Sequence, residues 1–279
     1  MKTAVALGSF DGVHIAHRSV LNLPKGYKKV AITFRKPPKM VFEGKTELIM
    51  SLETRTQVIK SLGFSEVDCL DFNKVRETEA LDFLEYISNK YNPKYISCGF
   101  NYRFGKGGKG DVAVLSEFCK QNGIELSVCE QVLVDGATVS STLIRNKLKD
   151  GKIEEANALM PTPFSFMSEV IKGDRRGRTI GFPTINQKYP EDLVKIKFGV
   201  YKVKVVIDGE EYDGISNIGI RPSFKSDYVI SETYIKDFSG DLYGKKVKII
   251  PQKFLREEKK FASLEQLKKQ IEKDINQIK

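Results

Sequence analysis

The spacing of apolar residues changes once along the chain, and this change constrains the fold more than any other feature. In the first part, short apolar stretches alternate with segments in which apolar residues recur at helical spacing, whereas beyond Pro161-Thr162-Pro163 the apolar segments are typical of strands. Two prolines so close together end a helix and favour a break. A chain of 279 residues is long enough for two domains. We therefore predict one domain over residues 1–160 and another over residues 161–279.

The first part carries five apolar stretches with the length of buried strands. They are Ala4–Leu7, Val30–Phe34, Val67–Leu70, Tyr95–Cys98 and Leu126–Cys129. Amphipathic helices are expected between them, and Gly63 and Gly123 stand where helices commonly end. Strands that alternate with helices form a parallel sheet through right-handed crossovers, and such sheets bind ligands at the carboxyl ends of their strands. We predict an α/β Rossmann-like domain.

The second part carries further strand-like stretches at Phe164–Ile171, Val200–Ile207, Val229–Ile235 and Val247–Ile250. Within the second of these, apolar residues alternate with lysines, and Asp208-Gly209 then favours a tight hairpin turn. Ser263-Leu264-Glu265-Gln266 has the pattern of a capping box and begins a last helix. The second part is predicted to be a closed antiparallel β-barrel followed by a C-terminal helix.

Composition excludes several classes of protein. The formal net charge of +10 invites a nucleic-acid partner, but the lysines are interleaved with glutamates and form no basic arm, so no nucleic-acid partner is expected. No apolar run approaches the ~20 residues of a membrane span, so no membrane is expected either. The cysteines show no Cys-x-x-Cys spacing, and we expect four free thiols in a reducing cytoplasm: Cys69, Cys98, Cys119 and Cys129.

The segment that directly follows the first strand has the features of a phosphate-binding loop. It reads Gly8-Ser9-Phe10-Asp11-Gly12-Val13-His14-Ile15-Ala16-His17 and leads into a short helix. Glycines let backbone N–H groups approach a ligand closely, and a helix N-terminus favours anions. Both histidines of the chain lie here, three residues apart on one side of a helical turn. The alternative is an ordinary turn with incidental histidines.

A second segment has matching chemistry. Val139-Ser140-Ser141-Thr142-Leu143-Ile144-Arg145 begins another helix with hydroxyl groups at its cap and an arginine in its first turn. Such a helix start binds anions, although the same residues cap many ordinary helices. The pairing of this segment with the histidine loop favours a phosphate site.

These motifs, together with Gly99-Phe100-Asn101-Tyr102-Arg103-Phe104-Gly105, resemble the adenylyltransferase module of prokaryotic bifunctional riboflavin kinase/FAD synthetases, whose fold is a nucleotidyltransferase fold. The resemblance implies that one loop holds ATP with Gly8, Phe10, Asp11, Gly12, His14 and His17. It implies that Ser141, Thr142 and Arg145 clamp the phosphates from the other side. Asn101, Arg103 and Phe104 would lie toward the flavin.

The sequence departs from that family at several places, and one of them is the stretch between His17 and Val30, which is shorter than expected. Ala16 replaces the glycine of the histidine signature, Asn101 replaces an aspartate, and Arg35-Lys36-Pro37-Pro38 stands where the family has Asp-Pro-His-Pro. A kinase-only descendant with a weakened adenylyltransferase is therefore an alternative.

The second part contains a loop rich in glycine and arginine, Gly173 to Asn186. Such a loop can surround phosphates with backbone N–H groups, and Thr184 and Asn186 offer neutral oxygens that Mg²⁺ accepts as ligands. The loop lacks the Gly-Lys-Ser/Thr of a Walker motif. Taken alone, it is equally compatible with a basic surface turn.

Further segments in the second part resemble the riboflavin kinase module of the same family: Asn217 to Phe224, Glu232-Thr233-Tyr234, Asp241 to Gly244 and Phe254 to Phe261. The resemblance implies that Mg-ATP is bound by Gly173, Arg178, Gly181, Pro183, Thr184 and Asn186, with Thr184 and Asn186 at the metal. Glu232 would be the general base, and Arg256 would flank the flavin beside the last helix. The implied partners are riboflavin, FMN and ATP. A flavin-binding regulatory protein is the non-enzymatic alternative, and the oligomeric state stays open.

Overall fold

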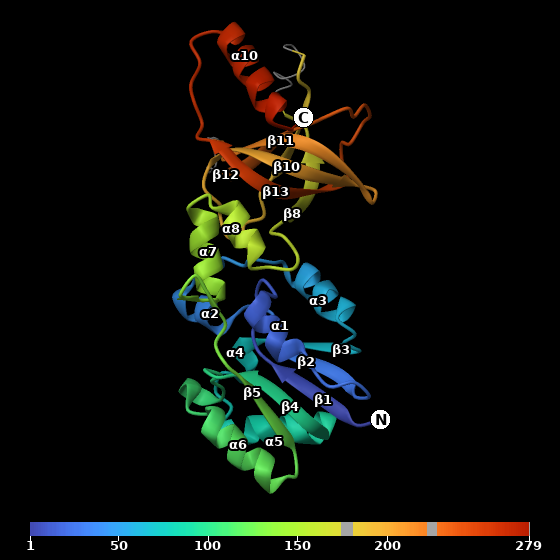
Figure 1. The fold of residues 1–279 in the computed structure, drawn as a ribbon, viewed down its shortest axis with the longest axis vertical. Helices are drawn as coiled ribbons and strands as arrows, with labels where there is room; N and C mark the ends of the chain where they lie inside the picture. Colours follow the sequence, from blue (N-terminus) through green and yellow to red (C-terminus); the bar gives the residue numbers. More distant parts are fainter. Residues whose placement is uncertain (174–180, 222–227, 279) are drawn as a thin grey trace. The chain divides into compact units, whose positions relative to one another are not determined.

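The computed structural model describes residues 1–173, 181–221 and 228–278, and the chain forms two compact units (Figure 1). The first comprises Met1–Ile144 with Leu159–Thr162, and the second comprises Arg145–Ala158 with Pro163–Lys279. Helix α7 (Ser141–Lys149) begins in the first unit, and helix α8 (Ile153–Ala158) belongs to the second. Asn157 joins α8 to the second unit, because its side chain donates to the Pro251 carbonyl and accepts from the Phe164 N–H.

The first unit contains the predicted parallel sheet. Its strands are β1 (Thr3–Leu7), β2 (Lys28–Phe34), β3 (Glu66–Leu70), β4 (Pro93–Gly99) and β5 (Glu125–Cys129). Their order is β3-β2-β1-β4-β5, and all neighbours are parallel. β2 and β3 are therefore added on one side of β1, and β4 and β5 are added on its other side. In such a sheet, the crevice at the carboxyl ends of the two strands where the order reverses is the usual ligand site.

Helices cover both faces of this sheet, as a parallel sheet requires (Figure 1). Helices α5 (Ala80–Tyr91) and α6 (Val112–Gln121) cover one face, and α1 (Ile15–Leu21) and α3 (Leu52–Ser61) cover the other. The unit also has short elements. They are α2 (Pro38–Glu43), α4 (Phe72–Val75), the 3₁₀ turn η1 (Lys106–Gly108) and the hairpin β6 (Leu133–Val134) and β7 (Ala137–Thr138).

The second unit is the predicted closed antiparallel barrel, with strand order β10-β11-β12-β9-β8-β13. The strands are β8 (Phe166–Ile171), β9 (Thr184–Lys188), β10 (Gly199–Ile207), β11 (Glu210–Arg221), β12 (Tyr228–Ile235) and β13 (Lys246–Arg256). Tyr201, Val203 and Val205 are buried as predicted, and Asp208 and Gly209 form the hairpin turn with positive φ. The interpretation of Thr184 to Asn186 as loop is wrong, because these residues form a strand.

The last helix, α10 (Leu264–Ile275), is followed by the turn η2 (Asn276–Ile278). Ser263 caps α10 as predicted, and its hydroxyl accepts from the Gln266 N–H at 3.3 Å. Ile275 and Ile278 pack against Val200 and Ile215 on the outer face of the barrel. A partly buried ion pair fixes the end of the helix: the Arg256 guanidinium donates to Asp274, with Nη2 2.7 Å from Oδ2.

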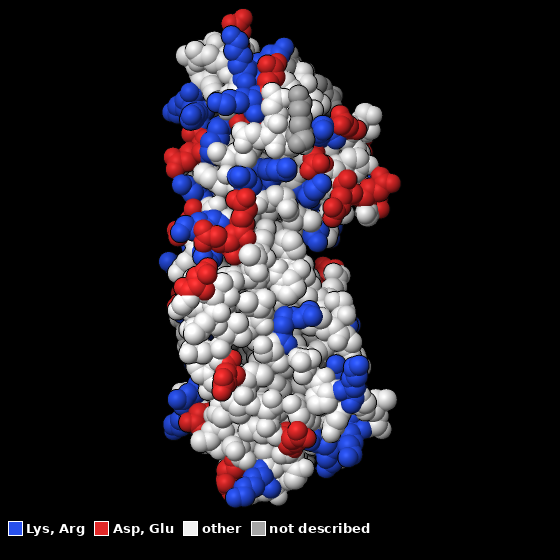
Figure 2. All heavy atoms as spheres, in the orientation of Figure 1, with Lys and Arg blue, Asp and Glu red and all other residues white. Residues whose placement is uncertain are grey.

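Charge is mixed over the face drawn in Figure 2, where Lys and Arg spheres are interspersed with Asp and Glu. In the part of the chain that the structure describes, no helix combines the length and apolar character of a membrane span.

Arg55 on α3 is fully buried and ties together the segments that follow β1 and β2. Its guanidinium donates to the Ser9 carbonyl at 2.9 Å, to the Phe34 carbonyl at 2.6 Å and to the Arg35 carbonyl at 3.1 Å. Burial lowers the pKa of this guanidinium, and the nearby Asp11 carboxylate opposes that shift. A surface arginine would contribute little, so Arg55 is a structural residue of the first unit.

Arg55→Met should lower the free energy of unfolding of the first unit by about 2–5 kcal/mol, because buried carbonyls would lose their donors. Lys60→Met is the matched control, since Lys60 is exposed on the same helix and should change stability by no more than about 0.5 kcal/mol. Urea unfolding followed by circular dichroism measures both. Equal urea midpoints for the two variants would show that Arg55 makes no such contribution to the free energy of unfolding.

Candidate active sites

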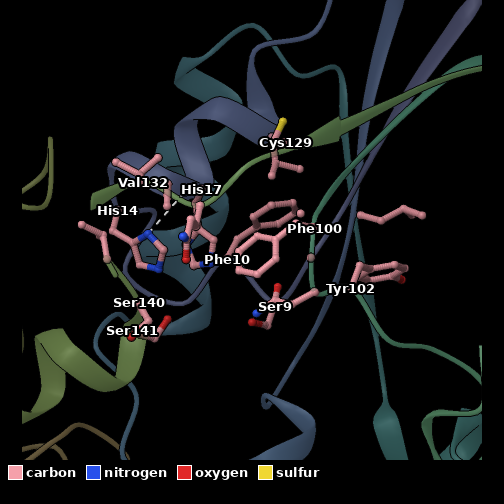
Figure 3. A pocket seen from close by; sticks show the side chains of 18 of the residues that line it. Ser9, Phe10, His14, His17, Phe100, Tyr102, Cys129, Val132, Ser140 and Ser141 are labelled. Atoms are coloured by element: carbon pink, nitrogen blue, oxygen red, sulfur yellow. Dashed lines mark hydrogen bonds between the residues drawn. The ribbon is translucent and has the colours of Figure 1, made fainter. Parts of the chain in front are cut away.

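A cavity of about 340 Å³ lies where the strand order of the first unit reverses. It is lined by residues that follow β1 (Gly8, Ser9, Phe10), β4 (Phe100 to Arg103) and β5 (Glu130 to Val132). Side chains of α1 and of the start of α7 complete it, and Figure 3 shows His14, His17, Ser140 and Ser141 gathered around it. The topology of the sheet therefore brings together both segments that the sequence indicated.

The loop between β1 and α1 has an unusual backbone. Phe10 and Val13 adopt positive φ angles of 49° and 40°, and Gly12 adopts 88°. A positive φ in a β-branched residue such as Val13 is strained, so the surrounding structure must enforce it. Asp11 contributes to this, because its buried carboxylate accepts the N–H groups of Ile49 and Met50 at 3.0 to 3.2 Å. These hydrogen bonds stabilise the loop in this conformation.

The two histidines have defined orientations. His14 is the N-cap of α1, and its Nδ1 accepts the His17 N–H at 3.3 Å. In the neutral ring the proton must then lie on Nε2, which makes that atom a donor. The His14 and His17 rings are stacked with centroids 3.5 Å apart, and Phe10 packs edge-on against His17 at 5.4 Å.

The start of α7 is joined to the same loop. The Ser141 hydroxyl donates to the Asp11 carbonyl at 2.8 Å, and Ser140 caps the helix by accepting the Leu143 N–H. This bond from Ser141 joins the loop between β1 and α1 to the start of α7 within the first unit.

The predicted residues divide into two groups. Gly8, Phe10, His14, His17, Asn101, Arg103 and Ser141 line the cavity. Asp11, Gly12, Phe104, Thr142 and Arg145 are outside its lining among the described residues, and Phe104 is part of the core with Phe83. Ala16 lines the cavity, as do Ser9, Phe100 and Tyr102, which belong to the predicted motifs, and Cys129, to which the sequence assigned no role in the site.

The second unit has a cavity of about 650 Å³ whose lining comes from the outer face of the barrel, the segment after β13 and α10. Its lining includes Thr184, Glu232 and Arg256, three of the predicted kinase residues. A second cavity of about 1070 Å³ is lined by Gly181, Pro183 and Thr184 together with Asp237 to Tyr243. Thr184 lines both cavities, so they meet at the start of β9.

Strand register places three polar residues in one row. Asn186 on β9 is directly opposite Glu232 on β12, and Glu232 is directly opposite Asn217 on β11. Residues opposite each other in antiparallel strands have Cβ atoms about 4.5–5.5 Å apart and share one face. Thr184 is two residues from Asn186 on β9 and therefore points to the same face.

The surroundings of Asn186 suit a hard cation. Its Oδ1 is buried and, among the residues that the structure describes, has no hydrogen-bond partner. The Asn186 amide fills the space beside Gly173, where a Cβ atom would lie 2.4 Å from Nδ2. A buried neutral oxygen without a donor is a ligand that Mg²⁺ accepts, and Thr184 offers a second one nearby. Arg178 lies outside the described residues.

Arg256 has a role that the sequence did not indicate. Its guanidinium donates to the Asp274 carboxylate, which also accepts from Gln270 at 2.8 Å. The guanidinium also lies over the Phe261 ring. Asp274 is only 2% exposed and also lines the cavity. An acidic residue within the apolar stripe of Ile271, Ile275 and Ile278 was a signal of a buried partner.

Two family models match the chain. One, described as riboflavin kinase, matches residues 160–279, and the other, described as FAD synthetase, matches residues 1–143. The bifunctional riboflavin kinase/FMN adenylyltransferase of Listeria monocytogenes is 34% identical over 97% of this chain and 89% of its own. The enzyme of the same name from Bacillus subtilis is 33% identical over 98% and 90%.

A solved structure has the same fold. The protein from Streptococcus pneumoniae, described as a macrolide-efflux protein, superimposes with a TM-score of 0.91 at 29% identity, over 99% of this chain and 93% of its own.

Proposed function

The chain belongs to the bifunctional riboflavin kinase/FMN adenylyltransferase family, and on that premise we propose that it phosphorylates riboflavin to FMN and adenylylates FMN to FAD. The observation that carries the proposal is that each unit has its own cavity, lined by residues of one of the two predicted sites. We infer that the junction between the two activities lies within residues 145–162, where segments of the two compact units alternate, and the boundary predicted at 160 stays a prediction. Four free cysteines support the cytoplasm as the compartment.

The kinase reaction is assigned to the second unit. Glu232 accepts the proton of the terminal ribityl hydroxyl, and the oxygen of that hydroxyl attacks the γ-phosphorus of ATP. The bond from that phosphorus to the β-phosphate oxygen breaks, and ADP is released. Riboflavin occupies the cavity beside α10, and ATP occupies the neighbouring cavity that contains Gly181 and Pro183. The shared position of Thr184 supports transfer where these two cavities meet.

Mg²⁺ is proposed to be held by Asn186 and Thr184. The buried Asn186 Oδ1, which lacks a donor among the described residues, supports this assignment. The ion, when bound, would neutralise charge on the phosphates. Gly173 leaves room for the Asn186 amide. Arg178, which lies outside the described residues, stays a predicted nucleotide-binding residue.

The adenylyltransferase reaction is assigned to the first unit. A phosphate oxygen of FMN attacks the α-phosphorus of ATP, and pyrophosphate leaves. The protein must position the two substrates and stabilise negative charge, so no protein nucleophile is required. His14 would donate from Nε2 and His17 would lie beside it. Gly8, Gly12 and Ser141 would border the phosphates, although the Ser141 hydroxyl and the Gly8 N–H already donate to the carbonyls of Asp11 and Ile32.

The remaining predicted residues receive supporting roles in this reaction. Asp11 holds the loop, and Asn101 and Arg103 border the flavin. Thr142 and Arg145, which belong to the first turns of α7, are proposed to meet the phosphates, and Phe104 supports the flavin side from the core. A kinase-only protein is the second candidate, and Ala16 favours it because its methyl group occupies part of the cavity lining.

Glu232→Gln should lower FMN formation by about 10²–10⁴-fold, which is the usual contribution of general base catalysis, while Mg-ATP and riboflavin still bind. Glu211→Gln is the matched control, since Glu211 is exposed on β11. FMN production from riboflavin and FAD production from supplied FMN are measured separately. A Glu232→Gln enzyme with near-normal FMN formation would exclude Glu232 as the base.

Asn186→Ala and Thr184→Ala should each raise the Mg²⁺ concentration needed for half-maximal kinase activity, because each variant removes an oxygen ligand. Asn146→Ala, at an exposed position on α7, should leave that concentration unchanged. Mg²⁺ titrations at saturating riboflavin give the comparison. Curves for both site variants that overlay the parent curve would contradict the assignment.

Ala16→Gly should raise the initial rate of FAD formation from FMN, because removal of the methyl group lets the nucleotide approach the loop more closely. Ala113→Gly, an exposed change in the first turn of α6, is the control and should not raise that rate. His14→Ala and His17→Ala should nearly abolish FAD formation. Full activity in both histidine variants would place the phosphate site elsewhere.

A further inference from the structure

The cavity beside α10 has an apolar part and a polar part. The apolar part is formed by Val200, Ile215, Phe261, Leu264, Leu267 and Ile271. The polar lining includes Thr184, Asn217, Glu232 and Glu258, and the charged residues Arg256, Lys259 and Asp274 also line the cavity. If riboflavin is the substrate, as the proposed function requires, its ring system matches the apolar part and its hydroxyl-bearing ribityl chain matches the polar part.

Asn217 is the neighbour of the proposed base within the polar part. It is directly opposite Glu232 in the β11–β12 register, and both side chains line the cavity. The Cβ atoms of such a pair are about 4.5–5.5 Å apart. A ribityl chain whose terminal hydroxyl meets Glu232 therefore brings its next hydroxyl within reach of Asn217.

The orientation of the Asn217 amide is fixed by Glu258. Asn217 Nδ2 donates to Glu258 Oε1 at 2.9 Å, and a carboxylate can only accept, so the amide nitrogen must face Glu258. Gly219 makes room for this carboxylate, because a Cβ atom at that position would lie 2.4 Å from Glu258 Oε1. Asn217 Oδ1 is thereby left as the remaining acceptor of the side chain.

Asn217 Oδ1 is buried and has no hydrogen-bond partner in the described part of the chain. A buried acceptor without a donor is costly, and a site that contains one discriminates strongly in favour of a ligand that supplies the donor. Each secondary hydroxyl of a ribityl chain supplies one.

We propose that Asn217 is a specificity-determining residue of the kinase site and that its Oδ1 accepts a hydrogen bond from the ribityl 4′-hydroxyl, next to the hydroxyl that is phosphorylated. Glu258 is a positioning residue that holds the amide in the required orientation. Together they select a substrate that ends in two adjacent hydroxyl groups.

The test compares riboflavin with 4′-deoxyriboflavin as substrates of the full-length enzyme. The parent enzyme should show a kcat/KM that is about 10–100-fold lower for the deoxy compound, because Asn217 Oδ1 is then left without a donor. Equal kcat/KM values for the two substrates would overturn the proposal. Failure of the parent to convert riboflavin itself would instead refute the kinase function on which the proposal rests.

Asn217→Ala should lower kcat/KM for riboflavin by about 10-fold or more and should bring the ratio between the two substrates to within about threefold. Glu258→Ala should reduce the same ratio in part, since the amide can then rotate. An equal loss on both substrates in Asn217→Ala would indicate a merely structural role and would overturn the proposal. If Asn217→Ala does not fold, Asn217→Ser decides between the same outcomes. Asn146→Ala should keep the parent's ratio.

Discussion

The register between β9, β12 and β11 is the constraint on which the kinase site depends. It aligns Asn186, Glu232 and Asn217 across three neighbouring strands, so that the proposed metal ligand, the proposed base and the proposed substrate acceptor share one face of the barrel. A shift by one residue would turn all three toward the interior, where Ser216, Ser231 and Thr233 now bond to one another. The closed barrel has no edge at these strands and therefore resists such a shift.

The first unit fixes its site by a different means. The reversal of strand order beside β1 creates the crevice, and buried polar groups hold the loop that lines it. Asp11 accepts two backbone N–H groups, and the Ser9 carbonyl accepts from both Thr33 and Arg55. These bonds lie around Phe10 and Val13, whose positive φ angles are costly, and they help to offset that cost.

Much of the fold followed from the sequence. Helices between buried strands predict the parallel sheet of the first unit, and strands in which apolar and polar residues alternate predict the barrel of the second. β9 escaped prediction because Thr184, Asn186 and Gln187 are polar. Gln187 is buried only because its Nε2 donates to the carbonyls of Ser168 and Val247. β13 runs past Val247–Ile250 because a register shift opposite Val203 accommodates Pro251.

The candidate sites were predictable to a similar degree. Motifs located His14, His17, Thr184 and Glu232, all of which line cavities. Arg55 could not be separated from surface charges by the sequence, because its burial depends on tertiary partners, whereas the one sequence signal for Asp274 was its place within the apolar stripe of the last helix. Asn217 was part of a motif, but its importance emerges only from the register with Glu232 and the contact with Glu258.

The central claim is that one chain performs both reactions. The most direct measurement incubates the full-length protein with riboflavin, ATP and Mg²⁺ and separates riboflavin, FMN and FAD over time. We predict that FMN forms first and that FAD follows with release of pyrophosphate. FMN as the only product would contradict the second activity, and the absence of both products would contradict the whole account.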